Sequence, residues 1–173
     1  MTFRLLDGRQ AAALAPELLA VRSDVCGNVP QAADRFRVQC RQPGFALALA
    51  SHGSYLVGYA AGMPLRPSTS WWRQLTTPLP DAVTAEHPGR TFALTDLVVR
   101  AAWRRQGVGQ TLHDLVLTGR TEERATLAVA PAATAAQAAF QSWGWRKIAR
   151  ALDPGHGTAV LDLMLRSLDG SGH

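Results

Sequence analysis

The spacing of apolar residues along the chain predicts short strands that alternate with helices. Apolar runs and period-two patterns predict strands at Phe3–Leu6, Phe45–Ala50, Tyr55–Ala61, Thr91–Arg100, Ala125–Val129, Trp145–Ala149 and Thr158–Leu165. Helical spacing predicts helices from Asp7 to about Val21, from about Gln31 to Cys40, from Val108 to about Thr118, and from Thr134 to Trp143. This order of elements is typical of an α+β fold in which helices flank a mixed central sheet.

Signals at the ends of the helices support these assignments. Asp7 and Gln10 have the spacing of a capping box at the start of the first helix. Pro16 lies within that helix and has no N–H to donate, so we expect the helix to kink or split there. Gly119 and Gly144 follow the third and fourth helices, where glycine favours the left-handed conformation of a C-terminal cap.

The segment from Leu65 to Arg90 interrupts this regular order. It contains four prolines and the adjacent residues Trp71 and Trp72. Loops longer than about 12 to 15 residues are usually functional or disordered, and two adjacent tryptophans argue against disorder. Trp71 and Trp72 are therefore candidate substrate-binding residues that form an aromatic wall, or else they anchor the loop to the core.

The length and composition of the chain fit one soluble domain. Its 173 residues suffice for one sizeable core, so we expect a single domain over residues 1–168 and a flexible tail at 169–173. No apolar run approaches the roughly 20 residues of a membrane span, and the N-terminus lacks the apolar core of a signal peptide. We therefore expect a cytoplasmic protein with no membrane partner. Cys26 and Cys40 lack the spacing of metal ligands, and no metal site is expected.

Basic residues exceed acidic residues, which gives a net charge of +5. The excess is nearly all arginine, because Lys147 is the only lysine. The planar guanidinium group suits phosphates, although a high share of arginine also follows from genome composition. No long run of like charge and no nucleic-acid-binding motif is present, so no nucleic-acid partner is expected.

The segment RRQGVGQTL, residues 104–112, has the chemistry of an anion site. Gly107 and Gly109 let backbone N–H groups approach a ligand without obstruction by a Cβ atom. The helix that follows adds unpaired N–H groups and the positive end of its dipole, and a pyrophosphate fits such a site. A dinucleotide fingerprint would need glycine at Leu112, and a Walker A loop would need a lysine. The alternative is a glycine-containing helix start that binds no ligand.

The stretch VVRAAWRRQGVGQTLHDLVL resembles motif A of the GNAT-type N-acetyltransferase superfamily. The superfamily signature, Arg/Gln-x-x-Gly-x-Gly/Ala, is matched by Arg104, Gly107 and Gly109. A second superfamily pattern, Asn-x-x-Ala-x-x-x-Tyr-x-x-x-Gly-Phe, is matched in part downstream. There the corresponding residues are Ala133, Ala136, Phe140, Gly144 and Trp145.

This resemblance implies a cofactor and the residues that bind it. In the superfamily, the strand before motif A pairs with the pantetheine arm of acetyl-CoA, and the turn binds its pyrophosphate. The implied residues are Leu97, Val98 and Val99 for the arm, Arg104, Arg105, Gln106, Gly107, Val108, Gly109, Gln110 and Thr111 for the pyrophosphate, and Phe140 packed against the arm.

Acetyl transfer to an amine needs a base, a stabilised oxyanion and a proton for the leaving thiolate. Asp96 interrupts an apolar strand where many relatives carry a glutamate base, so the resemblance implies that Asp96 is the catalytic base. Its side chain is one carbon shorter than that of glutamate, which favours a water relay. The alternative is a buried carboxylate that pairs with an arginine or caps a loop. Phe140 stands where relatives carry the tyrosine that protonates the thiolate, and phenylalanine cannot donate a proton. Its ring also fits a simple helix core.

The resemblance as a whole implies an acetyl-CoA-dependent N-acetyltransferase of bacterial cytosolic type. It would act on a primary amine of a small molecule by direct attack, as a monomer or a homodimer. The missing tyrosine supports a second hypothesis, a non-catalytic module that binds or senses acyl-CoA.

Overall fold

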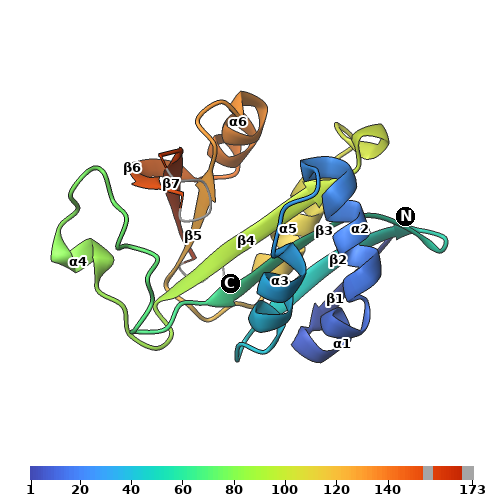
Figure 1. Ribbon diagram of the computed structural model, residues 1–173, viewed down its shortest axis with the longest axis horizontal. Coiled ribbons are helices and arrows are strands. Elements are labelled where there is room, and N and C mark those ends of the chain that lie inside the picture. The colour runs from blue at the N-terminus through green and yellow to red at the C-terminus, as the bar shows by residue number, and fades with distance from the viewer. Residues whose placement is uncertain (154–157, 169–173) are drawn as a thin grey trace. The chain divides into compact units, whose positions relative to one another are not determined.

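The computed structural model describes residues 1–153 and 158–168, which contain one mixed sheet in the strand order β1-β2-β3-β4-β5-β7-β6 (Figure 1). The strands are β1 Thr2–Asp7, β2 Ala46–His52, β3 Tyr55–Pro64, β4 Thr91–Val99, β5 Arg124–Val129, β6 Arg146–Leu152 and β7 Val160–Ser167. The helices are α1 Gly8–Ala13, α2 Ala15–Cys26, α3 Ala32–Cys40, α4 Asp81–Thr84, α5 Val108–Leu117 and α6 Thr134–Ser142, with a 3-10 turn at Ala101–Trp103. The prediction of an α+β fold with a mixed sheet flanked by helices is confirmed.

The chain divides into two compact units, and β4 contributes residues to both. The first unit is Met1–Met63 with Leu94–Arg120, and the second is Pro64–Ala93 with the residues from Thr121 onward. The predicted domain boundaries, 1–168, stay a prediction, and the predicted tail at 169–173 lies outside the described residues. Within those residues, no helix has the length and hydropathy needed to cross a bilayer.

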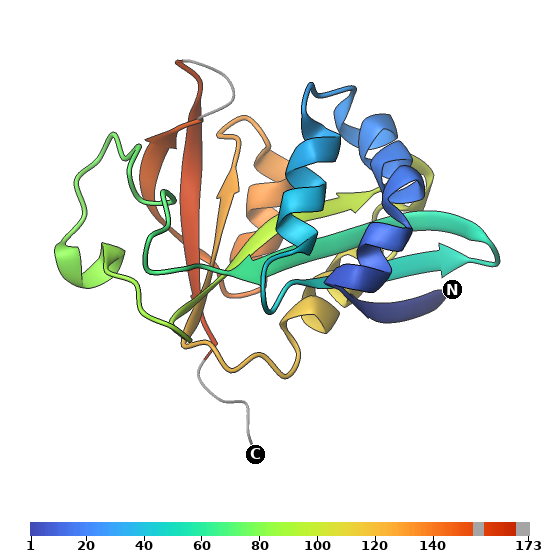
Figure 2. The same cartoon turned by 60° about the horizontal axis from the view of Figure 1, so that its bottom comes forward.

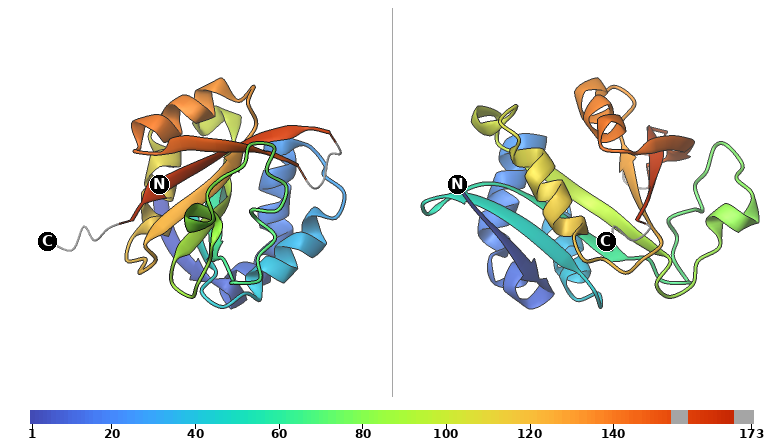
Figure 3. Two further views of the ribbon diagram at one scale, coloured as in Figure 1. Left: turned by 90° about the vertical axis from the view of Figure 1, so that its left-hand side faces the viewer. Right: turned by 180° about the vertical axis from the view of Figure 1, so that it is seen from behind.

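The first unit is built on β1, β2, β3 and the C-terminal part of β4. Strands β1, β2 and β3 pair antiparallel in chain order. The N–H of Arg100 donates to the carbonyl of Val57, and the hydroxyl of Thr95 donates to the carbonyl of Ala61, so β4 runs antiparallel to β3. Helices α1, α2 and α3 cover one face of this sheet and α5 covers the other (Figures 1 and 3).

The first predicted helix splits in two, as Pro16 allowed. The carboxylate of Asp7 accepts the N–H of Gln10 and the side chain of Gln10 accepts the N–H of Asp7, so the predicted capping box is present. Pro16 lies in the first turn of α2, where its missing N–H costs no helical hydrogen bond. Helix α2 runs past the predicted end at Val21 to Cys26, because the next breaker is Gly27 with φ 78°.

The second unit contains the first residues of β4, followed across its sheet by β5, β7 and β6. Residues Thr91–Ala93 pair parallel with β5, whereas β7 pairs antiparallel with both β5 and β6. The long connection before β4 is ordered: it contains α4, and Leu75 forms an antiparallel bridge with Ala151 of β6 (Figure 2). Trp72 of this connection forms a core cluster with Ala151, Leu163 and Leu165.

Candidate functional site

Helix α5 begins at the predicted glycine turn without a capping side chain. Gly107 is the N-cap residue with φ 81° and ψ 0°, in the left-handed region that favours glycine. A Cβ atom added there would meet no heavy atom within 4 Å, and the first turn of α5 carries no acidic residue. Val108 is buried and holds the helix start against the core, while Gln110 and Thr111 are exposed. The first turn is therefore open to an anion.

The residues before Gly107 bring positive charge to this turn. Arg105 also has a positive φ, 60°, which is unusual for a residue with a side chain. Arg104 is exposed, and its Nε donates to the carbonyl of Val99 at 3.0 Å, so its guanidinium lies beside the end of β4. Gln106 donates from Nε2 to the carbonyl of Ala102 at 3.2 Å. Two arginines thus stand next to the positive end of the α5 dipole.

Within the first unit, β4 is the last strand. Its pairing with β5 covers only Thr91–Ala93, so Leu94–Val99 pair with β3 alone in that unit. Val98 is buried in the core of the unit, while Leu97 and Val99 are half-buried. The strand segment predicted to bind the pantetheine arm is therefore an edge to which an extended chain of amides can add.

Gly58 of β3, which sequence reasoning missed, lies against this segment. A Cβ atom at Gly58 would come 2.5 Å from the carbonyl oxygen of Val98 and 3.1 Å from the Cα of Val99. A larger residue would push β4 away at the residues predicted to bind the arm. The sequence offered one signal for this contact: a glycine within an apolar strand often marks a place where another backbone segment approaches closely.

Asp96 lies on β4 in the first unit and pairs with an arginine of α2. Nη1 of Arg22 donates to Oδ1 of Asp96 at 2.7 Å, and the Asp96 side chain is 12% exposed. The structure therefore contains the arginine pair that was the alternative to catalysis. Such a pair is compatible with a base, because the second carboxylate oxygen is not used by Arg22.

Burial controls the acidity of Asp96. Desolvation raises the pKa of its carboxyl from 3.8 to about 6, although the charges of Arg22 and Arg35 and the hydrogen bond from Arg22 act in the opposite direction. A cavity of about 50 Å³ adjoins the carboxylate and is lined in part by Thr95 and by Arg35 of α3. A cavity of that size and polarity can hold a water molecule.

Tyr59 of β3 adds an unpartnered hydroxyl near this pair. Its side chain is fully buried, and no hydrogen-bond partner for the hydroxyl exists among the described residues. Burial raises the pKa of Tyr59, and the Asp96 charge raises it further while the Arg22 charge lowers it. Nε of Arg22 is likewise buried without a partner in the described part of the chain. Unsatisfied donors of this kind point to a ligand or water beside Asp96.

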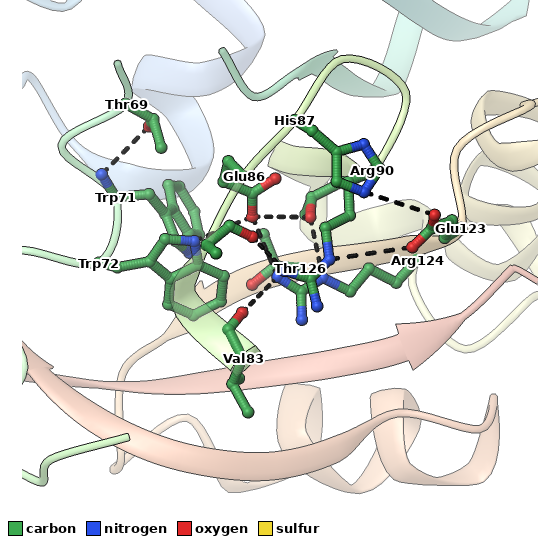
Figure 4. A network of polar contacts seen from close by, with 12 residues as sticks. Thr69, Trp71, Trp72, Val83, Glu86, His87, Arg90, Glu123, Arg124 and Thr126 are labelled. Atoms are coloured by element: carbon green, nitrogen blue, oxygen red, sulfur yellow. Dashed lines mark hydrogen bonds and ion pairs between the residues drawn. The ribbon is translucent and has the colours of Figure 1, made fainter. Parts of the chain in front are cut away.

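The two adjacent tryptophans differ in their surroundings in the second unit. Nε1 of Trp72 donates to Oε1 of Glu86 at 3.0 Å, and the guanidinium of Arg124 lies 5.4 Å from the Trp72 ring centre (Figure 4). The same Glu86 oxygen accepts bonds from Arg124 and from the Thr91 hydroxyl. Trp72 is therefore built into the core of its unit, which favours the anchoring interpretation for this residue.

Trp71 is half-buried and packs against the same core cluster as Trp72. Its backbone N–H donates to the Thr69 hydroxyl at 3.1 Å, whereas its indole N–H is buried and has no partner within residues 1–153 and 158–168. Its role in binding a substrate stays a prediction, and of the two tryptophans it is the candidate for that role.

Phe140 lies on α6 in the second unit and is buried among indoles. Its ring meets those of Trp143 and Trp145 edge to face, with centroids 5.6 Å and 6.0 Å away. This packing gives Phe140 a core role, and its predicted contact with a cofactor arm stays a prediction. No cluster of three potential metal ligands occurs in the described part of the chain.

Comparison with known proteins identifies the family. The model of the acetyltransferase (GNAT) family matches residues 17–145, which span β4, the glycine turn and α6. The chain belongs to the GNAT acetyltransferase family. No curated protein matches the chain in sequence.

Solved GNAT structures share the fold at low sequence identity. The ribosomal-protein-S18-alanine N-acetyltransferase of Escherichia coli is 13% identical with a TM-score of 0.70, over 99% of this chain and 96% of that one. An aminoglycoside 6'-N-acetyltransferase complexed with coenzyme A is 12% identical with a TM-score of 0.68, over the full length of both chains. The ribosomal-protein-alanine N-acetyltransferase of Brucella melitensis is 18% identical with a TM-score of 0.66, over 96% of this chain and 99% of that one.

Proposed function

We propose that this GNAT protein is an N-acetyltransferase that moves the acetyl group of acetyl-CoA to a primary amine of a small molecule. The observation that carries the proposal is the start of α5. There a helix N-terminus without a capping side chain, a left-handed glycine and two arginines follow the C-terminal part of β4, which pairs only with β3 within the first unit. This combination fits a pyrophosphate attached to an extended arm.

The cofactor contacts follow from this geometry. The N–H groups of Gly107, Val108, Gly109 and Gln110 would hold the pyrophosphate, with Arg104 and Arg105 supplying charge at the rim. The free edge of Leu97–Val99 would pair with the amides of the pantetheine arm. Support comes from the open space at Gly107 and the absence of acidic residues in the first turn of α5.

Asp96 is the proposed base. An acceptor amine arrives mainly as an ammonium ion and must lose a proton before it can attack. With a pKa of about 6, the Asp96 carboxyl is largely ionised at neutral pH and can accept that proton. The small cavity beside it gives space for the water that would relay the proton, and Arg22 holds the carboxylate in place.

The proposed reaction balances without an acyl-enzyme. The amine nitrogen forms a bond to the thioester carbonyl carbon, and the carbon–sulfur bond breaks. The nitrogen loses its second proton to water as the amide forms, and the water passes a proton to the departing thiolate. Cys40 is buried and Cys26 lies at the end of α2, so neither is offered as a nucleophile. Phe140 cannot supply the proton for the thiolate.

A second candidate is a module that binds or senses acyl-CoA without catalysis, and the phenylalanine at position 140 favours it. One pair of measurements separates the candidates: acetyl-CoA binding by calorimetry, and coenzyme A release against a panel of amines. Binding with amine-dependent release supports the enzyme. Binding with no release above the rate without amine, across the whole panel, supports the sensor.

A further inference from the structure

A groove with a largely apolar lining lies in the first unit, next to the small cavity that adjoins Asp96. It has a volume of about 310 Å³ and is formed by the end of α2, the connection that follows, and the first turn of α3. Arg22 and Ala32 line both this groove and the small cavity that contains Asp96. The groove and the cavity therefore share part of their walls, and Asp96 lines the cavity.

The charges around the groove and the cavity do not cancel. Arg22 has one carboxylate partner, Asp96, and its Nε is buried without a partner among the described residues. Arg35 lines the cavity, where its charge acts on Asp96, and makes no ion pair within residues 1–153 and 158–168. Asp34, which also lines the groove, is 82% exposed and lies 3.7 Å from Arg37, so its charge is screened by water and by that arginine.

The start of α3 adds helix N–H groups to one side of the groove, together with the carboxylate of Asp34 in the same turn. Gln31 is the N-cap residue, and its side chain makes no capping hydrogen bond. The N–H groups of the first turn, from Ala32 to Asp34, belong to residues that line the groove. Two arginines, one with an unused buried donor, thus stand beside a helix N-terminus, and each of these features favours a bound anion.

We propose that the acceptor is an amine that also carries a carboxylate, as a free amino acid does. Its ammonium group would lie toward Asp96, and its carboxylate would lie between the guanidinium of Arg35 and the free donor of Arg22. This inference rests on the proposed function for the position of the amine. A polycationic acceptor is disfavoured, because it would bring several ammonium groups to a site with two arginines and one buried carboxylate.

Calorimetry on the protein saturated with coenzyme A tests the proposal. Matched probes differ only in the anionic group: glycine against glycinamide, and L-phenylalanine against L-phenylalaninamide, with spermidine as the polycation. We expect the better-bound amino acid to bind at least ~10-fold more tightly than its amide, a difference of ~1.4 kcal/mol. Arg35→Gln should remove most of that preference, because it deletes the charge and the guanidinium group while keeping a polar side chain.

Arg41→Gln is the matched control. Arg41 is exposed at the opposite end of α3 and lines neither the groove nor the cavity, so the preference should be unchanged in that variant. Three results overturn the inference: amides or spermidine bind as tightly as the amino acids, the preference survives Arg35→Gln, or no probe binds below about 10 mM.

Coenzyme A release, measured with the same probes and acetyl-CoA, separates this inference from the proposed function. Amino acids that bind in an Arg35-dependent manner but release no coenzyme A contradict the enzyme and leave the carboxylate site standing. Release with amides or spermidine alone contradicts the carboxylate site and leaves the enzyme standing.

Discussion

Replacing Asp96 with asparagine keeps the shape of the side chain and removes its capacity to accept a proton. If Asp96 is the base, kcat should fall by ~10² to 10⁴ at neutral pH. The affinity for acetyl-CoA should change little, because the proposed cofactor contacts lie on Leu97–Val99 and at the start of α5. The assay is coenzyme A release at saturating acetyl-CoA, with calorimetry for the binding of acetyl-CoA.

The pH dependence of the wild-type kcat/KM gives a second test of Asp96 as the base. With a pKa of about 6, the Asp96 carboxyl is ionised in roughly nine tenths of the molecules at pH 7 and in roughly one tenth at pH 5. The wild-type kcat/KM should therefore fall about tenfold between pH 7 and pH 5. The residual kcat/KM of Asp96→Asn should show no such fall over this pH range.

The same shift in pKa predicts an effect on stability that does not involve catalysis. Folding raises the pKa of Asp96 from 3.8 to about 6, so the folded protein binds this proton more tightly than the unfolded chain. The resulting stabilisation is fully present below about pH 4 and is lost as the pH rises through about 6. A shift of this size corresponds to about 3 kcal/mol.

Asp96→Asn lacks this titration. Its free energy of unfolding should therefore improve relative to that of the wild type by about 2 kcal/mol between pH 4 and pH 7, most of the full effect. Denaturant unfolding at both pH values measures the difference. Full activity of Asp96→Asn at every pH would refute the base assignment, and a stability difference independent of pH would refute the raised pKa.

Four further predictions concern the glycine turn, the two tryptophans and Phe140. Gly107→Val should weaken acetyl-CoA binding by ~10-fold or more, ~1.4 kcal/mol, while the protein stays folded; unchanged affinity by calorimetry would contradict the proposed pyrophosphate site. Trp72→Ala should lower stability by ~3–5 kcal/mol, as for a buried aromatic. Trp71→Ala should raise the KM of the amine more than that of acetyl-CoA, and equal changes would argue against a wall at the acceptor. Phe140→Tyr should raise kcat by restoring a proton donor for the thiolate, and an unchanged kcat would show that this proton does not limit the rate.

Local features of the fold were predictable because short-range signals determine them. The capping box at Asp7 and the left-handed turn at Gly107 each depend on residues within a few positions in sequence. The helix was predicted to end at about Val21, but no helix-breaking residue lies between Val21 and Cys26. Helix α2 therefore continues to Cys26. The short helix α4 was missed because it lies in a segment rich in proline.

The surroundings of the candidate site depend on long-range contacts. Asp96 within an apolar strand indicates a need for a cation, but its partner Arg22 lies 74 residues away in a chain with many arginines. The burial of Glu86 beneath Trp72 is equally hidden, because a glutamate beside prolines resembles an exposed loop residue. Sequence patterns predict the candidate base and the glycine turn, whereas packing determines what surrounds them.

The transfer of an isotopically labelled acetyl group tests the central claim most directly. The wild-type protein is incubated with labelled acetyl-CoA and a panel of amines, and mass spectrometry follows the label in the amine and in the intact protein. The proposed function predicts that label appears in at least one amine at the rate of coenzyme A release, with none bound covalently to the protein. Label that stays in acetyl-CoA with every amine, while acetyl-CoA binds, would contradict it.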